Sequence, residues 1–437
     1  MEPSSPPAHS ASLFNISLRR CGLPALAYVG LLAATLVYAP NYRWSQGPLD
    51  YPFGSDFLQE WVGARMILTG HGHELYDAEV FRAWQHDRNV VGFEWNPDRH
   101  YPPVYPPWHY ALFVPLALMP YRWATMLWVA LLWGAVFING YLIRSIMLQS
   151  ETETQSSNGA RWKLTALWWL PVLLFPTVPM AVMFGQKSLV WLAILSLVVY
   201  LLQRHRHAWS GALFALMMFK PTLFYLIPLC MARYRNGRFL LGCGAGVAVI
   251  SGVSLAVLPW ELWQGYLYAM LQSVDYGTQG GYRVDWSCSL WSIALGAPAA
   301  WQGWVKLIVC LPCAGLVLAS LLKPQRMEVQ PRVVFQWLVA TLLLAPHAYH
   351  YDLCILLLPI CWMAVYEPRM SVITFMILAF GVALATRIYP LVPVPLLPFA
   401  LLGCFWIWRL PNADAAANSE GVKAAYGFAG MGDIRFR

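Results

Sequence analysis

Charged residues are scarce in this sequence. Asp, Glu, Lys and Arg make up 11% of its 437 residues, whereas a typical soluble domain has about 25%. Hydrophobic residues make up 59% and aromatic residues 15%. Apolar runs of roughly 17 to 22 residues recur along the chain, and a helix of about 20 residues crosses a hydrocarbon core. The composition therefore excludes a soluble globular protein and predicts an all-α polytopic membrane protein.

The sequence also lacks the motifs of common soluble enzymes. It contains no P-loop, no G-x-S-x-G and no H-E-x-x-H, so those chemistries have no motif support. It has no internal repeat, which weighs against transporter folds built from duplicated halves. Most of the nine cysteines lie in apolar segments, where a small packing role is typical, and we expect no disulfide framework.

The hydrophobic runs predict about twelve transmembrane helices. Their approximate ranges are 22–39, 122–144, 163–182, 187–203, 208–219, 221–232, 239–259, 303–322, 333–346, 351–366, 370–386 and 391–409. Because Pro221 follows Lys220 directly, we expect a kink or a break between the fifth and sixth of these segments.

The distribution of basic residues predicts the orientation of the chain. With Arg19 and Arg20 inside, the inside loops and the tail contain eighteen of the 29 basic residues, whereas residues 40–105 contain nine acidic and five basic ones. We therefore expect a cytoplasmic N-terminus over 1–21, a transmembrane domain over 22–409 and a disordered cytoplasmic tail over 410–437. Two large outer (periplasmic) loops cover 40–121 and 260–302.

The first outer loop contains predicted surface helices. Phe57, Trp61, Ala64 and Leu68 share one face of a helix near 55–69, and a second helix covers about 77–88. The apolar segment 106–120 contains Pro115 and is too short to cross a bilayer, so we expect a re-entrant or interfacial helix there.

Polar residues gather at the outer ends of the predicted membrane segments. Ionisable groups at membrane depth cost about 2.5–3.5 kcal/mol each on lenient scales, so they usually pair or form a site. Aromatic stretches such as "YPPVYPPW", which contains Tyr105, offer surfaces on which sugar rings can stack. The polar residues are Asp56, Glu60, Gln186, Lys187, Lys220, Arg283, Asp285, His347, His350, Asp352 and Arg387.

Structural alternatives exist for the three most prominent of these charges. Asp56 follows "GS" at a predicted helix start, where an acidic residue is a good cap. Glu60 could lie on a solvated face or pair with Arg65. Lys220 could extend its side chain to the lipid headgroups.

The histidines are equally open to a structural interpretation. His347 and His350 could be packed, hydrogen-bonded core residues. Their H-x-x-H spacing is also found in metal sites, with Asp352 or Asp56 as a third donor. We do not favour a metal.

Five segments occur in an order that is specific when taken together. They are "SDFLQEWVGARMILTGHGHELYD", "YPPVYPPWHYALFVPLALMP", "FGQKSLVWLAILSLVVYLL", "GALFALMMFKPTLFYLIPL" and "APHAYHYDLCILLLP". In these segments the sequence resembles the polytopic glycosyltransferases of family 87, which include polyprenol-phosphate-mannose-dependent mannosyltransferases. The resemblance covers about residues 55–360.

The resemblance implies a superfamily C glycosyltransferase fold in the bacterial inner membrane, with the active site facing the periplasm. It implies inverting transfer of a mannose-like hexose from a polyprenyl-phosphate donor to a lipid or glycan acceptor, without a cofactor or a nucleic acid partner. Asp56 would be the base, and Lys220, His347, His350 and Arg283 would bind the donor phosphate. The residues that would shape the substrate pocket are Gln186, Glu60 and Tyr105.

Two departures from the family pattern bear on the sugar and the acceptor. Ser287–Ser289, "SCS", stand where many members have "NQS", and Lys187 stands where a small or hydrophobic residue is commoner. Two rival functions remain: a flippase for lipid-linked sugars, and a non-catalytic subunit of an envelope assembly system. A flippase would need polar groups through the membrane depth, whereas most lie at the outer ends here.

Overall fold

The computed structural model describes residues 26–34, 52–154, 169–272, 284–322, 330–388 and 395–408. In these ranges the chain is built from helices, and its one strand-like pairing is an isolated bridge between Ser287 and Tyr349. The predicted all-α class is confirmed. The predicted N-terminal segment 1–21, the tail 410–437 and Arg283 lie outside the described residues.

Apolar helices of membrane-spanning length make this a membrane protein. Within the described ranges, four helices qualify by length and composition, and a fifth candidate is a pair bent by 120°. Many of the predicted segments correspond to shorter apolar helices, so the predicted number of twelve stays a prediction. The four are Tyr121–Ser150, Gly237–Val257, Ala299–Leu321 and Pro368–Ala385, and the bent pair is Thr177–Phe184 with Ser188–Gln203.

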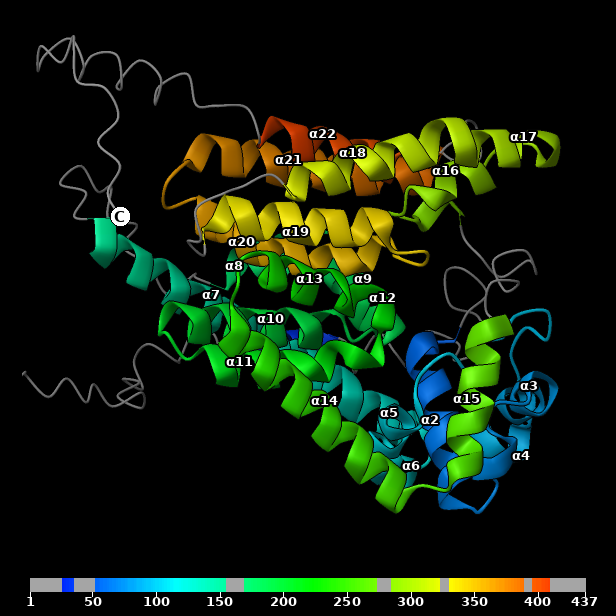
Figure 1. The fold of residues 1–437 in the computed structure, drawn as a ribbon. Coiled ribbons are helices and arrows are strands. Elements are labelled where there is room, and N and C mark those ends of the chain that lie inside the picture. Colours follow the sequence, from blue (N-terminus) through cyan, green and yellow to red (C-terminus); the bar gives the residue numbers. More distant parts are fainter. Residues whose placement is uncertain are drawn as a thin grey trace, which may run out of the picture.

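The helical bundle is layered. Figure 1 shows α19 and α20 between a layer that contains α18, α21 and α22 and a layer that contains α10 and α11. The bundle helices are α7 (Tyr121–Thr154), α8 (Leu170–Leu174), α9 (Thr177–Phe184), α10 (Ser188–Gln203), α11 (His207–Phe214), η2 (Ala215–Phe219), α12 (Pro221–Phe224), α13 (Leu226–Arg233), α14 (Gly237–Val257), α16 (Trp291–Leu295), α17 (Ala299–Val305), η4 (Lys306–Cys310), α18 (Leu311–Leu321), α19 (Pro331–Leu344), η5 (His350–Leu356), α20 (Leu357–Met363), α21 (Pro368–Ile388) and α22 (Leu397–Ile407).

A second group of helices lies at one end of this bundle, as Figure 1 shows. The predicted helices near 55–69 and 77–88 are confirmed as α2 and α3, and the segment 106–120 forms two short helices. Of the four residues on the predicted face of α2, Phe57, Trp61 and Ala64 are buried, whereas Leu68 near the C-terminal end is exposed. The group contains α2 (Ser55–Leu68), η1 (Gly72–Glu74), α3 (Ala78–His86), α4 (Arg88–Val91), α5 (Pro107–Leu112), α6 (Val114–Ala117) and α15 (Trp260–Gln272).

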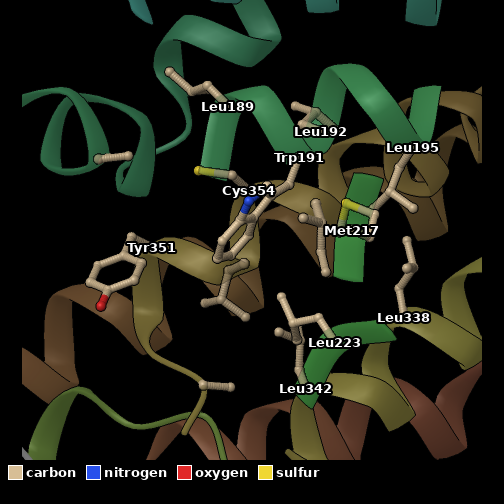
Figure 2. Packing of buried hydrophobic residues seen from close by; sticks show 14 of the residues in the cluster. Leu189, Trp191, Leu192, Leu195, Met217, Leu223, Leu338, Leu342, Tyr351 and Cys354 are labelled. Carbon is tan, nitrogen blue, oxygen red and sulfur yellow. The ribbon is translucent and has the colours of Figure 1, made fainter. Parts of the chain in front are cut away.

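The predicted break at Lys220–Pro221 is confirmed. The 3-10 helix η2 ends at Phe219, Lys220 has a non-helical backbone with φ −119° and ψ 83°, and α12 begins with Pro221. Figure 2 shows apolar side chains packed around Trp191, among them Met217 of η2 and Leu223 of α12, which lie on either side of the break in the sequence. The labelled side chains come from α10 (Leu189, Leu192, Leu195), η2 (Met217), α12 (Leu223), α19 (Leu338, Leu342) and η5 (Tyr351, Cys354).

Candidate active site

The start of α2 packs closely against the turn between α9 and α10. Gly54 and Gly185 both have positive φ angles, 69° and 70°, which glycine adopts without steric cost. A Cβ on Gly185 would lie 2.8 Å from Cβ of Phe57. The Gly54 amide donates to the Met183 carbonyl at 2.9 Å. This close approach brings the first turn of α2 to the 185–187 turn.

Asp56 lies in that first turn, and Gln186 donates a hydrogen bond to its carboxylate. The N-cap position of α2 is occupied by Gly54. The alternative that Asp56 serves as the helix cap is therefore wrong. Burial raises the pKa of Asp56 from 3.8 to about 6, although the Gln186 hydrogen bond and the charge of Lys187 act in the opposite direction.

Glu60, one helical turn further along α2, is 1% exposed and accepts a hydrogen bond from Lys187. The alternatives that Glu60 is solvated or pairs with Arg65 are wrong, because Arg65 donates to the Ala117 carbonyl at 2.9 Å instead. Nε2 of His109 lies 3.6 Å from Oε1 of Glu60. Burial lowers the pKa of His109 to about 3, so this imidazole is neutral. Burial also lowers the pKa of Lys187, against the charges of Asp56 and Asp352, and its direct contact makes Lys187 the partner of Glu60.

Lys220 at the helix break pairs with Asp352 of η5. Its Nζ lies 2.8 Å from Oδ2 of Asp352 and 4.4 Å from the centre of the Trp191 ring. The same Asp352 oxygen accepts the backbone N–H of Tyr349 at 2.9 Å. The Lys220 side chain is 14% exposed and its ammonium group is bound by Asp352, so it is not extended toward lipid headgroups.

The remaining predicted residues lie around these two ion pairs. Lys187 Nζ is 4.0 Å from the centre of the Tyr105 ring. His347 is partly buried, and burial together with the charge of Lys220 lowers its pKa. His350 is fully buried, with its ring 5.0 Å from that of Trp286 in an edge-on arrangement.

The structure thus brings together Asp56, Glu60, Gln186 and Tyr105 around Lys187, and places Lys220 and His347 in a neighbouring cluster with Asp352. The charges of Lys187 and Lys220 both act on Asp56, which links the two clusters. The sequence reasoning missed His109 and assigned no role to Lys187. Lys187 carried a signal, because it stands next to Gln186 and departs from the family pattern.

Among the described residues, no group of three or more His, Cys, Asp or Glu side chains is placed to hold a metal ion. The site that the structure does present is a set of fixed side-chain cations beside a carboxylate whose pKa is close to neutral pH.

The protein is thus a polytopic membrane protein. At one end of its helical bundle a half-buried carboxylic acid lies among lysines and neutral imidazoles, and such a site suits acid–base chemistry and anion binding. The model of glycosyltransferase family 87 matches residues 104–346, more than half of the chain, and the protein belongs to this family. Gln186, Lys187 and Lys220 lie inside the matched range, whereas Asp56 precedes it. Comparison with curated proteins and with solved structures finds no match.

Proposed function

We propose that this glycosyltransferase moves a mannose-like hexose from a polyprenyl-phosphate donor to a lipid or glycan acceptor. The reaction takes place at the outer face of the bacterial inner membrane, in a twelve-span bundle of the superfamily C glycosyltransferase type. The observation that carries the proposal is the position of Asp56. It is held by Gln186, lies near two lysines, and has a pKa of about 6, which suits a base that works near neutral pH.

The reaction is a single displacement. Asp56 accepts the proton of the acceptor hydroxyl as that oxygen attacks the anomeric carbon of the sugar. The bond between the anomeric carbon and the phosphate oxygen breaks, and polyprenyl phosphate leaves from the opposite face, which inverts the anomeric configuration.

Lys220 stabilises the phosphate that leaves. Its ammonium group has three donors, and the bond to Asp352 uses one of them. Asp352 therefore holds Lys220 in place while other N–H groups remain for phosphate oxygens. A fixed cation at the position of the developing charge lowers the barrier without moving during the reaction. His347, whose pKa is lowered, acts as a neutral hydrogen-bond partner.

The test is transfer by the purified full-length protein in nanodiscs, with a panel of polyprenyl-phosphate hexoses and acceptor lipids. Release of polyprenyl phosphate and labelling of the acceptor are measured together. Asp56→Asn keeps the size of the side chain and removes the proton acceptor, and turnover should fall by a factor on the order of 10²–10⁴.

Glu60→Gln is the matched control for this test. If Asp56→Asn keeps full turnover and Glu60→Gln loses it, the base is Glu60. If the donor crosses the bilayer and no polyprenyl phosphate is released with any donor, the protein is a flippase and the proposal is wrong.

A further inference from the structure

Two adjacent side chains in the 185–187 turn bind two carboxylates of α2. Gln186 donates to Asp56, and Lys187 donates to Glu60. Asp56 and Glu60 are four residues apart, so they lie on one face of the helix, one turn from each other. We propose that Lys187 is a positioning residue for Asp56 and acts through Glu60. This inference rests on the proposed function, because it takes Asp56 as the base.

Glu60 needs a cation to remain charged in its place. Its side chain is 1% exposed, and a buried carboxylate without a partner is strongly unfavourable. The nearby His109 does not supply a positive charge, because burial keeps the ring neutral and its centre lies 4.8 Å from that of Phe219 in a stacked arrangement. Burial lowers the pKa of Lys187 as well, but the charges of Asp56 and Asp352 act to raise it. Because Lys187 also contacts Glu60 directly, it is the group that compensates Glu60.

Lys187 is also too enclosed to serve mainly as a phosphate ligand. Its side chain is 4% exposed, against 14% for Lys220. It is bound by Glu60 and lies over the Tyr105 ring. The two lysines thus have different surroundings, and Lys220 alone of the pair has an exposed part that a donor phosphate could reach.

Lys187 affects Asp56 in two ways. Its positive charge lowers the pKa of Asp56 directly, and by compensating Glu60 it also removes like-charge repulsion along the helix. Without Lys187, an ionised Glu60 would disfavour a second negative charge one turn away. Asp56 would then ionise only at a higher pH. Its hydrogen bond to Gln186 would also no longer be supported by the adjacent contact between Lys187 and Glu60. The other groups that interact with Asp56 by hydrogen bond or charge are Tyr101, Tyr105, Tyr121, Lys220 and Tyr351.

A double-variant cycle separates this role from direct substrate binding. The four proteins are the wild type, Glu60→Gln, Lys187→Gln and the double variant, each as the full chain in nanodiscs. kcat and KM for the donor are measured across pH. In Lys187→Gln we expect kcat to fall by a factor on the order of 10, as in strongly coupled pairs, and the acidic limb of the profile to move to higher pH.

The double variant decides the question. It removes both charges, so it should recover kcat to within about threefold of the wild type, a deviation typical of sites that no longer interact, with the acidic limb near its original position. If Lys187 binds the donor phosphate directly, the double variant stays as impaired as Lys187→Gln and KM for the donor rises in both. That result overturns the inference.

The cycle remains decisive if a single variant does not fold. A folded double variant with wild-type kcat supports the role through Glu60, and a folded but inactive double variant overturns it. Failure of the proposed function is seen separately, because Asp56→Asn would then keep its turnover whatever the cycle gives. Loss of turnover in Asp56→Asn, with no coupling between Glu60 and Lys187, removes this inference alone.

Discussion

Nζ of Lys220 lies 2.8 Å from Oδ2 of Asp352, although the two residues are 132 positions apart in the sequence. The contact joins the helix break at Pro221 to the 3-10 helix η5. It fixes the one partly exposed ammonium group among the buried charges described above, and it makes Asp352 the residue that orients the proposed phosphate ligand.

Asp352→Asn should therefore weaken donor binding. The variant keeps a side-chain oxygen near Lys220 and the Tyr349 amide but removes the charge that holds the ammonium group. Because Lys220 is partly exposed, water offsets some of the loss. We expect a KM increase for the donor of about 10-fold, or about 1.4 kcal/mol, just below the 1.5–3 kcal/mol range of charged hydrogen bonds.

Glu367→Gln is the matched control. Glu367 pairs with Arg332, with Arg332 Nε 2.6 Å from its Oε1, and neither residue belongs to the site. This variant should lower stability without changing KM for the donor. An unchanged KM in Asp352→Asn would contradict the assignment of Lys220 to the phosphate.

The raised pKa of Asp56 gives opposite pH dependences for activity and stability. Its folded-state pKa of about 6 lies above its ordinary value of 3.8. The folded state therefore favours the protonated acid, and this contribution to stability is complete below about pH 4 and lost as pH rises through about 6. Activity needs the ionised base, so turnover should rise over the same range.

The measurement compares wild type with Asp56→Asn from pH 4 to pH 8. A shift of two pKa units corresponds to about 3 kcal/mol, and solvent at the partly exposed carboxylate reduces it. Asp56→Asn should gain relative thermal stability as pH rises from 4 to 8. A stability difference that does not vary with pH would show that Asp56 has an ordinary pKa.

Hydropathy located several of the long helices in advance. The predicted segments 187–203, 239–259 and 370–386 coincide closely with α10, α14 and α21, because burial in lipid leaves long apolar runs in the sequence. The break at Lys220–Pro221 was equally readable, since proline has a local effect on the backbone.

The pairing of the charges was not readable in the same way. Glu60 looks like a solvated residue in the sequence, and its partner Lys187 is 127 positions away. Which carboxylate a lysine meets depends on how α2 docks against the α9–α10 turn, and that docking depends on two glycines whose role shows only in three dimensions. Local patterns carry no record of such contacts.

The docking of α2 can be tested at Gly185. Gly185→Ala places a methyl group 2.8 Å from Cβ of Phe57 at a φ of 70°, so α2 must move away or the turn must change. Either shift separates Gln186 from Asp56. We expect turnover to fall by a factor on the order of 10², as a misplacement of about 1 Å can cause.

Gly92→Ala is the control for the backbone strain alone. Gly92 has a φ of 85° with no heavy atom within 4 Å of a Cβ. It should lose about 1 kcal/mol of stability, the ordinary cost of a left-handed alanine, and keep its turnover. Equal turnover in the two variants would contradict the role of the Gly185 contact.

The orientation of the chain in the membrane can be tested with two exposed arginines. Arg88 lies in α4 of the group beside the bundle, with its side chain 74% exposed, and Arg206 lies in the predicted inside loop and is also exposed. The positive-inside rule places them on opposite sides. In intact inner-membrane vesicles of known orientation, an impermeant maleimide should label Arg88→Cys from the periplasmic side and Arg206→Cys only after permeabilisation. Wild type provides the background, since its described cysteines are buried or partly buried.

Labelling of both variants from the same side would mean that an odd number of crossings has been misassigned between residues 88 and 206. The first segment to re-examine would then be 106–120, which forms the short helices α5 and α6.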